Sequence, residues 1–161
     1  MERKDKTNYY LDIADSVLNR STCMRRLYGA IIVREDEIVS TGYNGAPRGR
    51  KNCIDLGHCT RESMNIPSGQ RYELCRSVHA EQNAIISAAR KNTIGGTLYL
   101  AGRDGKTGMV LADATPCSLC RRMIINAGIE TVICRTGENT YSVTKVQEWI
   151  DHDDSLPEGM N

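Results

Sequence analysis

The chain has 161 residues, a length that can bury one sizeable hydrophobic core. Its formal net charge is +1, which gives no sign of a strongly basic nucleic-acid-binding surface. No apolar run approaches a membrane span, and the charged residues 1–6 lack the apolar core of a signal peptide. We therefore expect a cytoplasmic protein with no membrane partner. Seven cysteines in a reducing compartment favour metal ligands and buried thiols over disulfides.

The N-terminal part predicts one helix followed by a β-hairpin. Apolar residues recur at helical spacing over residues 7–19. Two short apolar runs, residues 30–33 and 38–41, flank the polar turn 34–37 and predict the two strands of the hairpin.

The central part predicts a parallel strand pair. Apolar spacing favours a helix from about residue 79 to Lys91. Residues 97–100 and 131–134 read as strands, and they bracket a helix that begins at Pro116 and ends at Ala127-Gly128. A strand–helix–strand order of this kind implies a parallel pair with a right-handed crossover.

The C-terminal part predicts a last short helix over residues 143–150, which includes Trp149. An acidic tail follows over residues 151–161, and we expect it to fray. The sequence contains no internal repeat or low-complexity segment, so we expect a single domain over residues 1–161.

Two separated motifs carry the chemistry: H-x-E at residues 79–81 and P-C-x-x-C at residues 116–120. His79, Cys117 and Cys120 offer three zinc ligands, and Glu81 is a free carboxylate beside them. A structural zinc is normally closed by four protein ligands, whereas a catalytic zinc keeps three and leaves one position for water. Cys117 and Cys120, at i and i+3, are expected on one face of a helical turn, near a helix N-terminus that lowers thiol pKa.

Each of these residues has a simpler interpretation when taken alone. A Cys-x-x-Cys pair can be half of a zinc ribbon or a redox pair, and a lone histidine is more often a core residue. Glu81 alone could complement a helix dipole. The coincidence of all four residues in this order favours a zinc site that activates water.

The two motifs, together with residues 41–47 (TGYNGAP), resemble the deoxycytidylate (dCMP) deaminase family of the cytidine deaminase-like superfamily. The resemblance extends from Ser21 to about Ile133. It implies an α/β fold, a three-layer α/β/α sandwich around a mixed five-stranded sheet. It also implies that the chain is a single zinc-dependent deaminase domain.

The resemblance implies hydrolytic deamination of dCMP to dUMP and ammonia. His79, Cys117 and Cys120 then hold the catalytic Zn²⁺, and Glu81 transfers protons as base and then as acid. Asn44 maps to the residue that hydrogen-bonds the deoxyribose hydroxyl, and backbone groups near Ala80 and Thr115 orient the base. Without the resemblance, Asn44-Gly45 reads as a plain turn. A role confined to the ligand predicts that Asn44→Ala leaves thermal stability nearly unchanged.

Two segments depart from the compact family pattern. Residues 101–114 form an insertion that we interpret as a hairpin extending the preceding strand. Residues 44–76 lack periodicity, and a structureless stretch of that length needs something to organise it. The resemblance suggests a second, structural zinc here, with four cysteine ligands: Cys23, Cys53, Cys59 and Cys75. His58 could replace Cys59, and the alternative is that these are ordinary buried thiols, as we expect for Cys134.

The sequence leaves the phosphate site and the exact substrate open. Six arginines are candidates for the phosphate: Arg25, Arg26, Arg48, Arg50, Arg121 and Arg122. The alternative enzymes are a cytidine or deoxycytidine deaminase and a tRNA adenosine deaminase, and the near-neutral charge disfavours the second. A non-catalytic zinc-stabilised interaction module is the alternative of another class, but it has no use for Glu81. We expect a small nucleotide as the partner, no nucleic acid, and a homo-oligomer.

Overall fold

The computed structural model describes all 161 residues, and its five strands form one sheet in the order β2-β1-β3-β4-β5. The strands are β1 (Arg26–Arg34), β2 (Glu37–Tyr43), β3 (Thr97–Asp104), β4 (Thr131–Arg135) and β5 (Tyr141–Lys145). Strand β1 runs antiparallel to β2 and β3, β3 and β4 are parallel, and β5 returns antiparallel to β4. The sheet is therefore mixed, as predicted, and contains the predicted hairpin and parallel pair.

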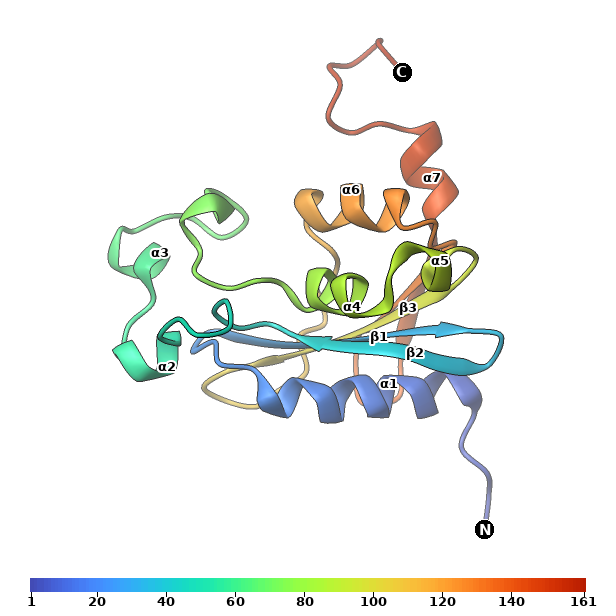
Figure 1. Cartoon of the computed structure of the whole chain (residues 1–161), viewed down its shortest axis with the longest axis horizontal. Coiled ribbons are helices and arrows are strands. Elements are labelled where there is room, and N and C mark those ends of the chain that lie inside the picture. Colours follow the sequence, from blue (N-terminus) through green and yellow to red (C-terminus); the bar gives the residue numbers. More distant parts are fainter.

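Helices cover both faces of this sheet (Figure 1). The α-helices are α1 (Lys6–Val17), α2 (Cys53–Leu56), α3 (Thr60–Ser63), α4 (Ala80–Ala88), α5 (Arg90–Thr93), α6 (Ser118–Asn126) and α7 (Val146–Asp151); the 3₁₀ turns are η1 (Leu18–Arg20) and η2 (Tyr72–Leu74). Helix α1 lies on one face, and α4, α5 and α6 lie on the other. The predicted three-layer α/β/α sandwich is confirmed. No helix combines the length and the apolar character needed to cross a membrane.

The sheet separates two hydrophobic cores. Ile31 and Val33 of β1 pack with Leu11 and Ala14 of α1, whereas Ala30 and Ile32 point to the α4 and α6 side. Successive side chains of a strand point to opposite faces, so one strand serves both cores. This alternation explains why the apolar run of β1 is continuous in sequence.

Helix α4 approaches strand β2 closely at Gly42. A Cβ atom on Gly42 would stand 2.3 Å from the carbonyl oxygen of Ala80 and 2.4 Å from the amide nitrogen of Ala84. Only a residue without a side chain permits this contact. The first turn of α4 is thereby fixed against the end of β2, and it carries the H-x-E motif.

Two predicted helices differ from the structure. The helix predicted to reach Lys91 breaks at Ala89, whose φ of 66° separates α4 from α5. The helix predicted over residues 143–150 begins only at Val146, because residues 141–145 form the edge strand β5. The open edge of β4 offers backbone hydrogen bonds to these residues, a tertiary effect that local apolar spacing does not report.

The insertion over residues 101–114 is the hairpin-like extension that the sequence predicts. Strand β3 continues to Asp104, and Arg103 forms an isolated bridge with Val110. The carboxylate of Asp104 accepts the backbone N–H groups of Lys106 and Thr107 at 2.9 and 2.8 Å. These bonds close the tip of the hairpin.

A buried arginine organises part of the irregular segment between β2 and α4. Arg61 is only 7% exposed, and its Nη2 atom donates to the carbonyl oxygens of Pro67 at 3.1 Å and Gln70 at 2.6 Å. One buried guanidinium thus binds two backbone carbonyls of the loop and holds residues 67 and 70 together. The segment with α2 and α3 extends beyond one end of the sheet (Figure 1).

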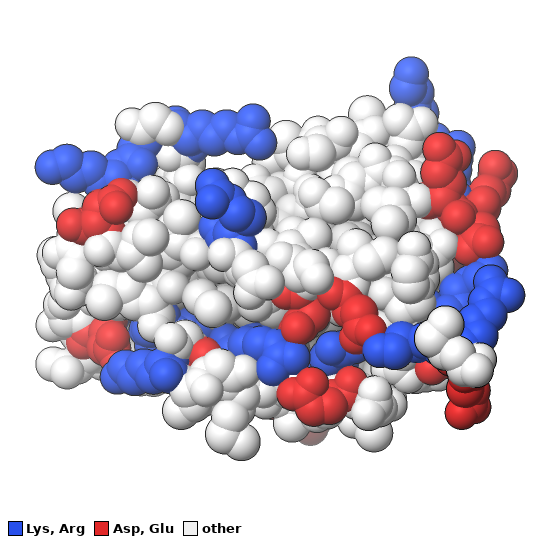
Figure 2. Space-filling view, turned by 90° about the horizontal axis from the view of Figure 1, so that it is seen from below, with Lys and Arg blue, Asp and Glu red and all other residues white.

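The face covered by α1 carries charges of both signs. Figure 2 shows basic and acidic side chains interspersed on this face. Residues of α1 form ion pairs with other elements: Lys6–Asp36 at 2.9 Å, Arg103–Asp15 at 2.7 Å and Arg135–Asp12 at 2.6 Å. This face presents no single-sign patch of the kind that a polyanion would need.

Tyr10 supplies a pH-dependent contact between α1 and the β1–β2 turn. Its hydroxyl donates to Asp36 Oδ1 at 2.6 Å, and this bond, together with burial, raises the pKa of Tyr10 to about 12. The bond requires the protonated phenol, so its contribution is complete below pH 10, the ordinary pKa, and is lost as pH rises toward 12.

We expect Tyr10→Phe to lower the free energy of unfolding by about 1 kcal/mol at pH 8. Denaturant unfolding between pH 8 and 11.5 checks this. The wild type should lose stability relative to the variant above pH 10, because only the wild type carries this bond. An unchanged difference between the two proteins across that range would contradict the assignment.

Candidate active site

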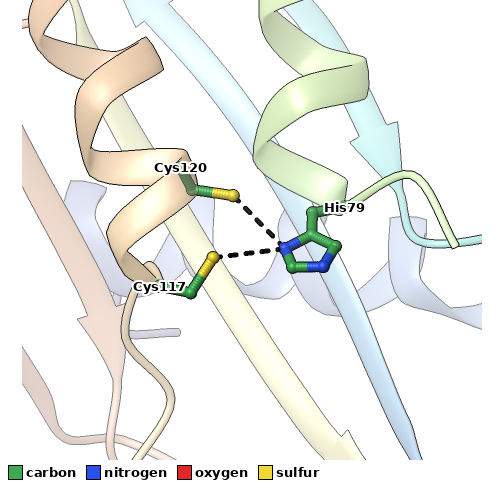
Figure 3. Close-up of side chains that lie close together, drawn as sticks. All are labelled: His79, Cys117 and Cys120. Carbon is green, nitrogen blue, oxygen red and sulfur yellow. Dashed lines mark hydrogen bonds between the residues drawn. The ribbon is translucent and has the colours of Figure 1, made fainter. Parts of the chain in front are cut away.

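The two sequence motifs meet in space. His79, Cys117 and Cys120 are the one group of three or more metal-ligating side chains whose ligand atoms all lie within 4.8 Å of one another. The Nδ1 atom of His79 is 3.5 Å from Cys117 Sγ and 3.4 Å from Cys120 Sγ (Figure 3). These distances bring one nitrogen and two sulfurs together as a prospective zinc site.

The starts of two helices position these ligands. His79 is the N-cap residue of α4, and its backbone N–H donates to Gln82 Oε1 at 2.8 Å. Cys117 is the N-cap residue of α6, and buried Pro116 precedes it. Helix α6 thus begins two residues later than predicted, and Cys117 lies just before its first turn rather than within it. The two sulfurs nevertheless face the same imidazole.

The electrostatics of the group suit a cation. Hydrogen bonding to Cys120 and His79 lowers the pKa of Cys117 to about 4 against the opposing effect of burial. The hydrogen bond to Cys117 and burial raise the pKa of Cys120. Burial lowers the pKa of His79, but hydrogen bonds to Cys117 and Cys75 outweigh it and raise the pKa to about 10. A metal ion at this group would bind the deprotonated thiols and the neutral imidazole, so its binding would release protons.

The donor set fits a catalytic zinc. Two thiolates and one imidazole are ordinary zinc ligands, and three protein ligands leave one position for water or substrate. The fourth nearby group is Glu81, whose Oε2 accepts from Cys120 Sγ at 3.6 Å. Glu81 is 6% exposed, and burial raises the pKa of its carboxyl group.

A pocket opens over this group. Of the residues that the sequence predicts for the site, His79, Glu81, Cys117, Asn44 and Thr115 line it. Cys120 is fully buried beneath it. Ala80 is also fully buried, at the first turn of α4, and does not line the pocket.

Asn44 is held by the protein itself. Its Oδ1 accepts from the backbone N–H of Tyr28 at 2.8 Å and from Ser21 Oγ at 2.6 Å, and its Nδ2 donates to the carbonyl oxygen of Arg26 at 2.9 Å. Neither Asn44 nor Gly45 has a positive φ, so the alternative of a left-handed Asn-Gly turn is wrong. One N–H of the amide remains for a ligand. The Asn44 side chain thus makes three internal hydrogen bonds, so we now expect Asn44→Ala to lower the stability of the protein.

Three arginines contribute to the pocket wall. Arg25 and Arg26, two of the six predicted phosphate candidates, line it together with Arg61. Arg61 was not among the candidates, because no motif or periodicity marks a buried arginine in an irregular segment. Its Nε is buried without a hydrogen-bond partner. Arg121, by contrast, lies over the Trp149 ring, with its Cζ atom 5.1 Å from the ring centroid, away from the pocket.

The extra cysteines lie near one another but do not form a closed metal site. Burial and the charges of Cys23, Cys59 and Cys75 raise the pKa of Cys53. Unlike His79, Cys117 and Cys120, these four cysteines do not form a group of three or more close ligand atoms, and a tetrahedral zinc would need its sulfurs gathered about one ion. Burial raises the pKa of Cys75, but the His79 imidazole and Ser77 outweigh it and lower that pKa.

Two other predicted residues of this group have clear positions. His58 is exposed, and its Nδ1 atom lies 3.2 Å from the carbonyl oxygen of Leu56. Cys134 is a buried core thiol, as predicted, and burial raises its pKa to about 12.

Comparison with known families agrees with this geometry. Residues 4–136 match the family model of the cytidine and deoxycytidylate deaminase zinc-binding region. The chain belongs to this deaminase family. The matched range contains both motifs and the strands β1 to β4, and only β5 lies outside it.

Several deoxycytidylate deaminases are similar in sequence. That of Schizosaccharomyces pombe is 34% identical over 137 residues, which cover 85% of this chain and 39% of the yeast protein. That of Mycobacterium phage D29 is 36% identical over 138 residues, which cover 83% of this chain and 96% of the phage protein. The chain spans about two fifths of the length of the two yeast relatives and nearly all of the phage relative.

A solved structure of a family member has the same fold. The crystal structure of dCMP deaminase from the cyanophage S-TIM5 in complex with dCMP and dUMP matches with a TM-score of 0.59 and 26% sequence identity. The match covers 84% of each chain. The zinc-binding deaminase family and the His/Cys/Cys group together support zinc as the metal of this chain.

Proposed function

We propose that this chain is a zinc-dependent deaminase that converts dCMP to dUMP and ammonia. In this proposal His79, Cys117 and Cys120 hold one zinc ion, and Glu81 is the catalytic residue. The observation that carries it is a buried carboxylate beside three prospective zinc ligands at one pocket. The named activities of the relatives support the substrate, and the single sheet that bears both helix starts supports one deaminase domain over residues 1–161.

The chain's own residues account for the proton transfers. Zinc, when bound, supplies a Lewis acid that lowers the pKa of water. Glu81 accepts a proton from the attacking water, and burial, which raises the pKa of its carboxyl group, favours this protonated form. It delivers this proton to N3 of cytosine, then takes the second water proton from the new hydroxyl group on C4 and delivers it to the departing amine. The water oxygen ends on C4, the C4–N bond breaks, and ammonia leaves.

The pocket wall suggests how the nucleotide is oriented. We assign the remaining N–H of Asn44 to the deoxyribose hydroxyl and the backbone of Thr115, which lines the pocket, to the base. Ala80 does not line the pocket, so for it we propose only a backbone contact to the base from the first turn of α4, next to His79. We assign the phosphate to the arginine side of the pocket, where Arg25 and Arg26 lie beside Arg61.

Substitution of Arg25 or Arg26 should therefore lower activity on a nucleotide more than activity on a nucleoside. We expect Arg25→Gln and Arg26→Gln each to lower kcat/KM for dCMP by about 10–100-fold, since a charge-assisted hydrogen bond contributes about 1.5–3 kcal/mol. Deoxycytidine, which has no phosphate, should change by less than about twofold. Arg122→Gln is the control, because Arg122 does not line the pocket. Equal losses on both substrates would contradict the phosphate assignment.

Asn44→Ala should reduce both stability and activity. We expect the free energy of unfolding to fall by about 1–3 kcal/mol, because the N–H of Tyr28 and the carbonyl of Arg26 lose their partners. The kcat/KM for dCMP should fall as well, through the lost sugar contact. Denaturant unfolding and steady-state kinetics measure the two effects. The exposed Asn139→Ala is the control, and an Asn44 variant of unchanged stability would refute the structural part.

The substrate is tested by ammonia release across four compounds: dCMP, deoxycytidine, CMP and a tRNA anticodon stem-loop. We expect dCMP to give the highest kcat/KM. A higher kcat/KM for deoxycytidine or CMP would make that compound the substrate in place of dCMP. Activity on the stem-loop alone would favour a tRNA deaminase. Zinc binding without ammonia from any of the four would favour a non-catalytic module.

We also propose a second, structural zinc held by Cys23, Cys53, Cys59 and Cys75. Its support is the proximity of the other three thiols to Cys53. The sulfurs must draw together, and Cys75 must exchange its contact with His79 for the metal. Elemental analysis should then find two zinc ions per chain, one of which Cys53→Ser removes and Cys134→Ser does not. One zinc per replete wild-type chain would rule this site out.

We further propose that the chain forms a homo-oligomer. Strand β5 lies at an edge of the sheet and leaves Val143 53% exposed, and Ile150 of α7 is 51% exposed. Exposed apolar side chains on an open edge suit contact with a second copy. Light scattering that gives a monomer mass across micromolar concentrations would reject this proposal.

A further inference from the structure

The wall of the pocket beside His79 is formed by the 3₁₀ turn η2. The Tyr72 ring meets the imidazole of His79 edge-on, with centroids 5.2 Å apart and planes at 82°. Edge-to-face contact at this distance is a favourable aromatic geometry. No family motif of this sequence includes Tyr72.

Arg61 holds Tyr72 in this position. Its Cζ atom lies 4.6 Å from the centroid of the Tyr72 ring, within the range of a cation–π interaction. The same guanidinium donates to Pro67 and Gln70, in the loop that leads into η2. The buried Arg61 guanidinium therefore fixes both the loop and the Tyr72 ring, and it holds that ring in edge-to-face contact with His79.

His79 needs such support. As the N-cap residue of α4 it has an extended backbone, with φ −73° and ψ 157°, so its side chain leaves the helix instead of packing along it. Its Nδ1 atom must face both sulfurs for all three ligands to converge. Hydrogen-bonding partners of a ligating histidine fix its ring orientation, and their loss typically costs about 10–100-fold in metal affinity. A ring that packs against the imidazole restrains the same orientation through contact.

We infer that Tyr72 is a positioning residue for the metal site: its ring, braced by Arg61, keeps the His79 imidazole aimed at Cys117 and Cys120. This inference rests on the proposed function only in that His79 binds zinc. It gives the segment between α2 and α4 a role in metal retention.

The test is zinc release from the zinc-loaded full-length chain, followed with a chromogenic chelator in excess. Tyr72→Phe keeps the ring edge and should release zinc within about twofold of the wild-type rate. Tyr72→Leu removes the rigid edge and should release zinc about tenfold faster or more. Tyr72→Met, which retains most of the volume without a ring, should behave as Tyr72→Leu and serves if the leucine variant does not fold.

Cobalt substitution supplies a second readout. The visible absorption of Co²⁺ reports ligand geometry, so the spectrum of Tyr72→Met should differ from that of the wild type, and the spectrum of Tyr72→Phe should not. If the folded Tyr72→Met variant releases zinc at the wild-type rate and has the same cobalt spectrum as the wild type, the inference is wrong. A wild-type chain that retains zinc but does not deaminate dCMP would overturn the proposed function and leave this comparison intact.

Discussion

Glu81→Gln should lower kcat for dCMP deamination by about three orders of magnitude or more while leaving the zinc content and the fold intact. Glutamine preserves the size of the side chain and can still contact Cys120, but it cannot carry the proton between water, N3 and the amine. General acid–base catalysis alone contributes about 10²–10⁴-fold, and the same group also activates the water.

Steady-state ammonia release and elemental analysis measure the two halves of this prediction. Glu148→Gln, an exposed carboxylate on α7, is the control and should retain wild-type rates. A Glu81→Gln protein that deaminates dCMP at near the wild-type rate with its zinc intact would show that the assigned proton transfers are wrong. Loss of zinc from the variant would instead make Glu81 a part of the metal site.

Gly42→Ala should be the most damaging methyl addition near the site. The new Cβ would stand 2.3 Å from the Ala80 carbonyl oxygen and 2.4 Å from the Ala84 amide nitrogen, both backbone atoms of α4. Helix α4 must therefore move away from β2, and its first turn carries Glu81 and follows His79. Overpacking costs about 1–3 kcal/mol and occasionally more. We expect more than about 3 kcal/mol here, because backbone rather than side chain is displaced.

Thermal and denaturant unfolding measure this loss, and zinc content should fall with it. Gly137→Ala is the matched control, because its Cβ would meet only the rotatable Thr140 side chain, with the nearest atom at 2.5 Å in a turn. The control should change the free energy of unfolding by less than about 1 kcal/mol. A Gly42 variant of similar stability to this control would mean that α4 does not lie on β2 as described.

The prospective metal ligands could be predicted because their information is local. Cys117 and Cys120 stand one helical turn apart after Pro116, and His79 and Glu81 stand at the start of a periodic apolar run. Each pattern fixes a helix start. Strands β2 and β3 run in the same direction, each antiparallel to β1, so α4 after β2 and α6 after β3 both begin at the same end of the sheet. The strand–helix–strand order predicts the parallel pair, and the three-layer fold follows from the resemblance to the deaminase family.

Other features depend on contacts between distant residues and leave no local pattern. Residues 143–145 have helix-compatible spacing but join β4, whose open edge supplies hydrogen bonds. Arg61 and Tyr72 lie in a segment without periodicity, and only the folded loop brings them beside His79. Asn44 lines the pocket and also makes three internal hydrogen bonds. The sequence motif indicates only a contact with the ligand, so it does not predict the loss of stability that we expect when this side chain is removed.

Hydrolysis of dCMP in water enriched in oxygen-18 tests the central claim most directly. The zinc-loaded wild-type chain should release one ammonia for each dUMP formed, and mass spectrometry should find one oxygen-18 atom at C4 of each dUMP. Glu81→Gln, with its zinc retained, should form neither product above background. Absence of dUMP from the zinc-loaded wild type, or dUMP without the label from solvent, would contradict hydrolytic deamination by this site.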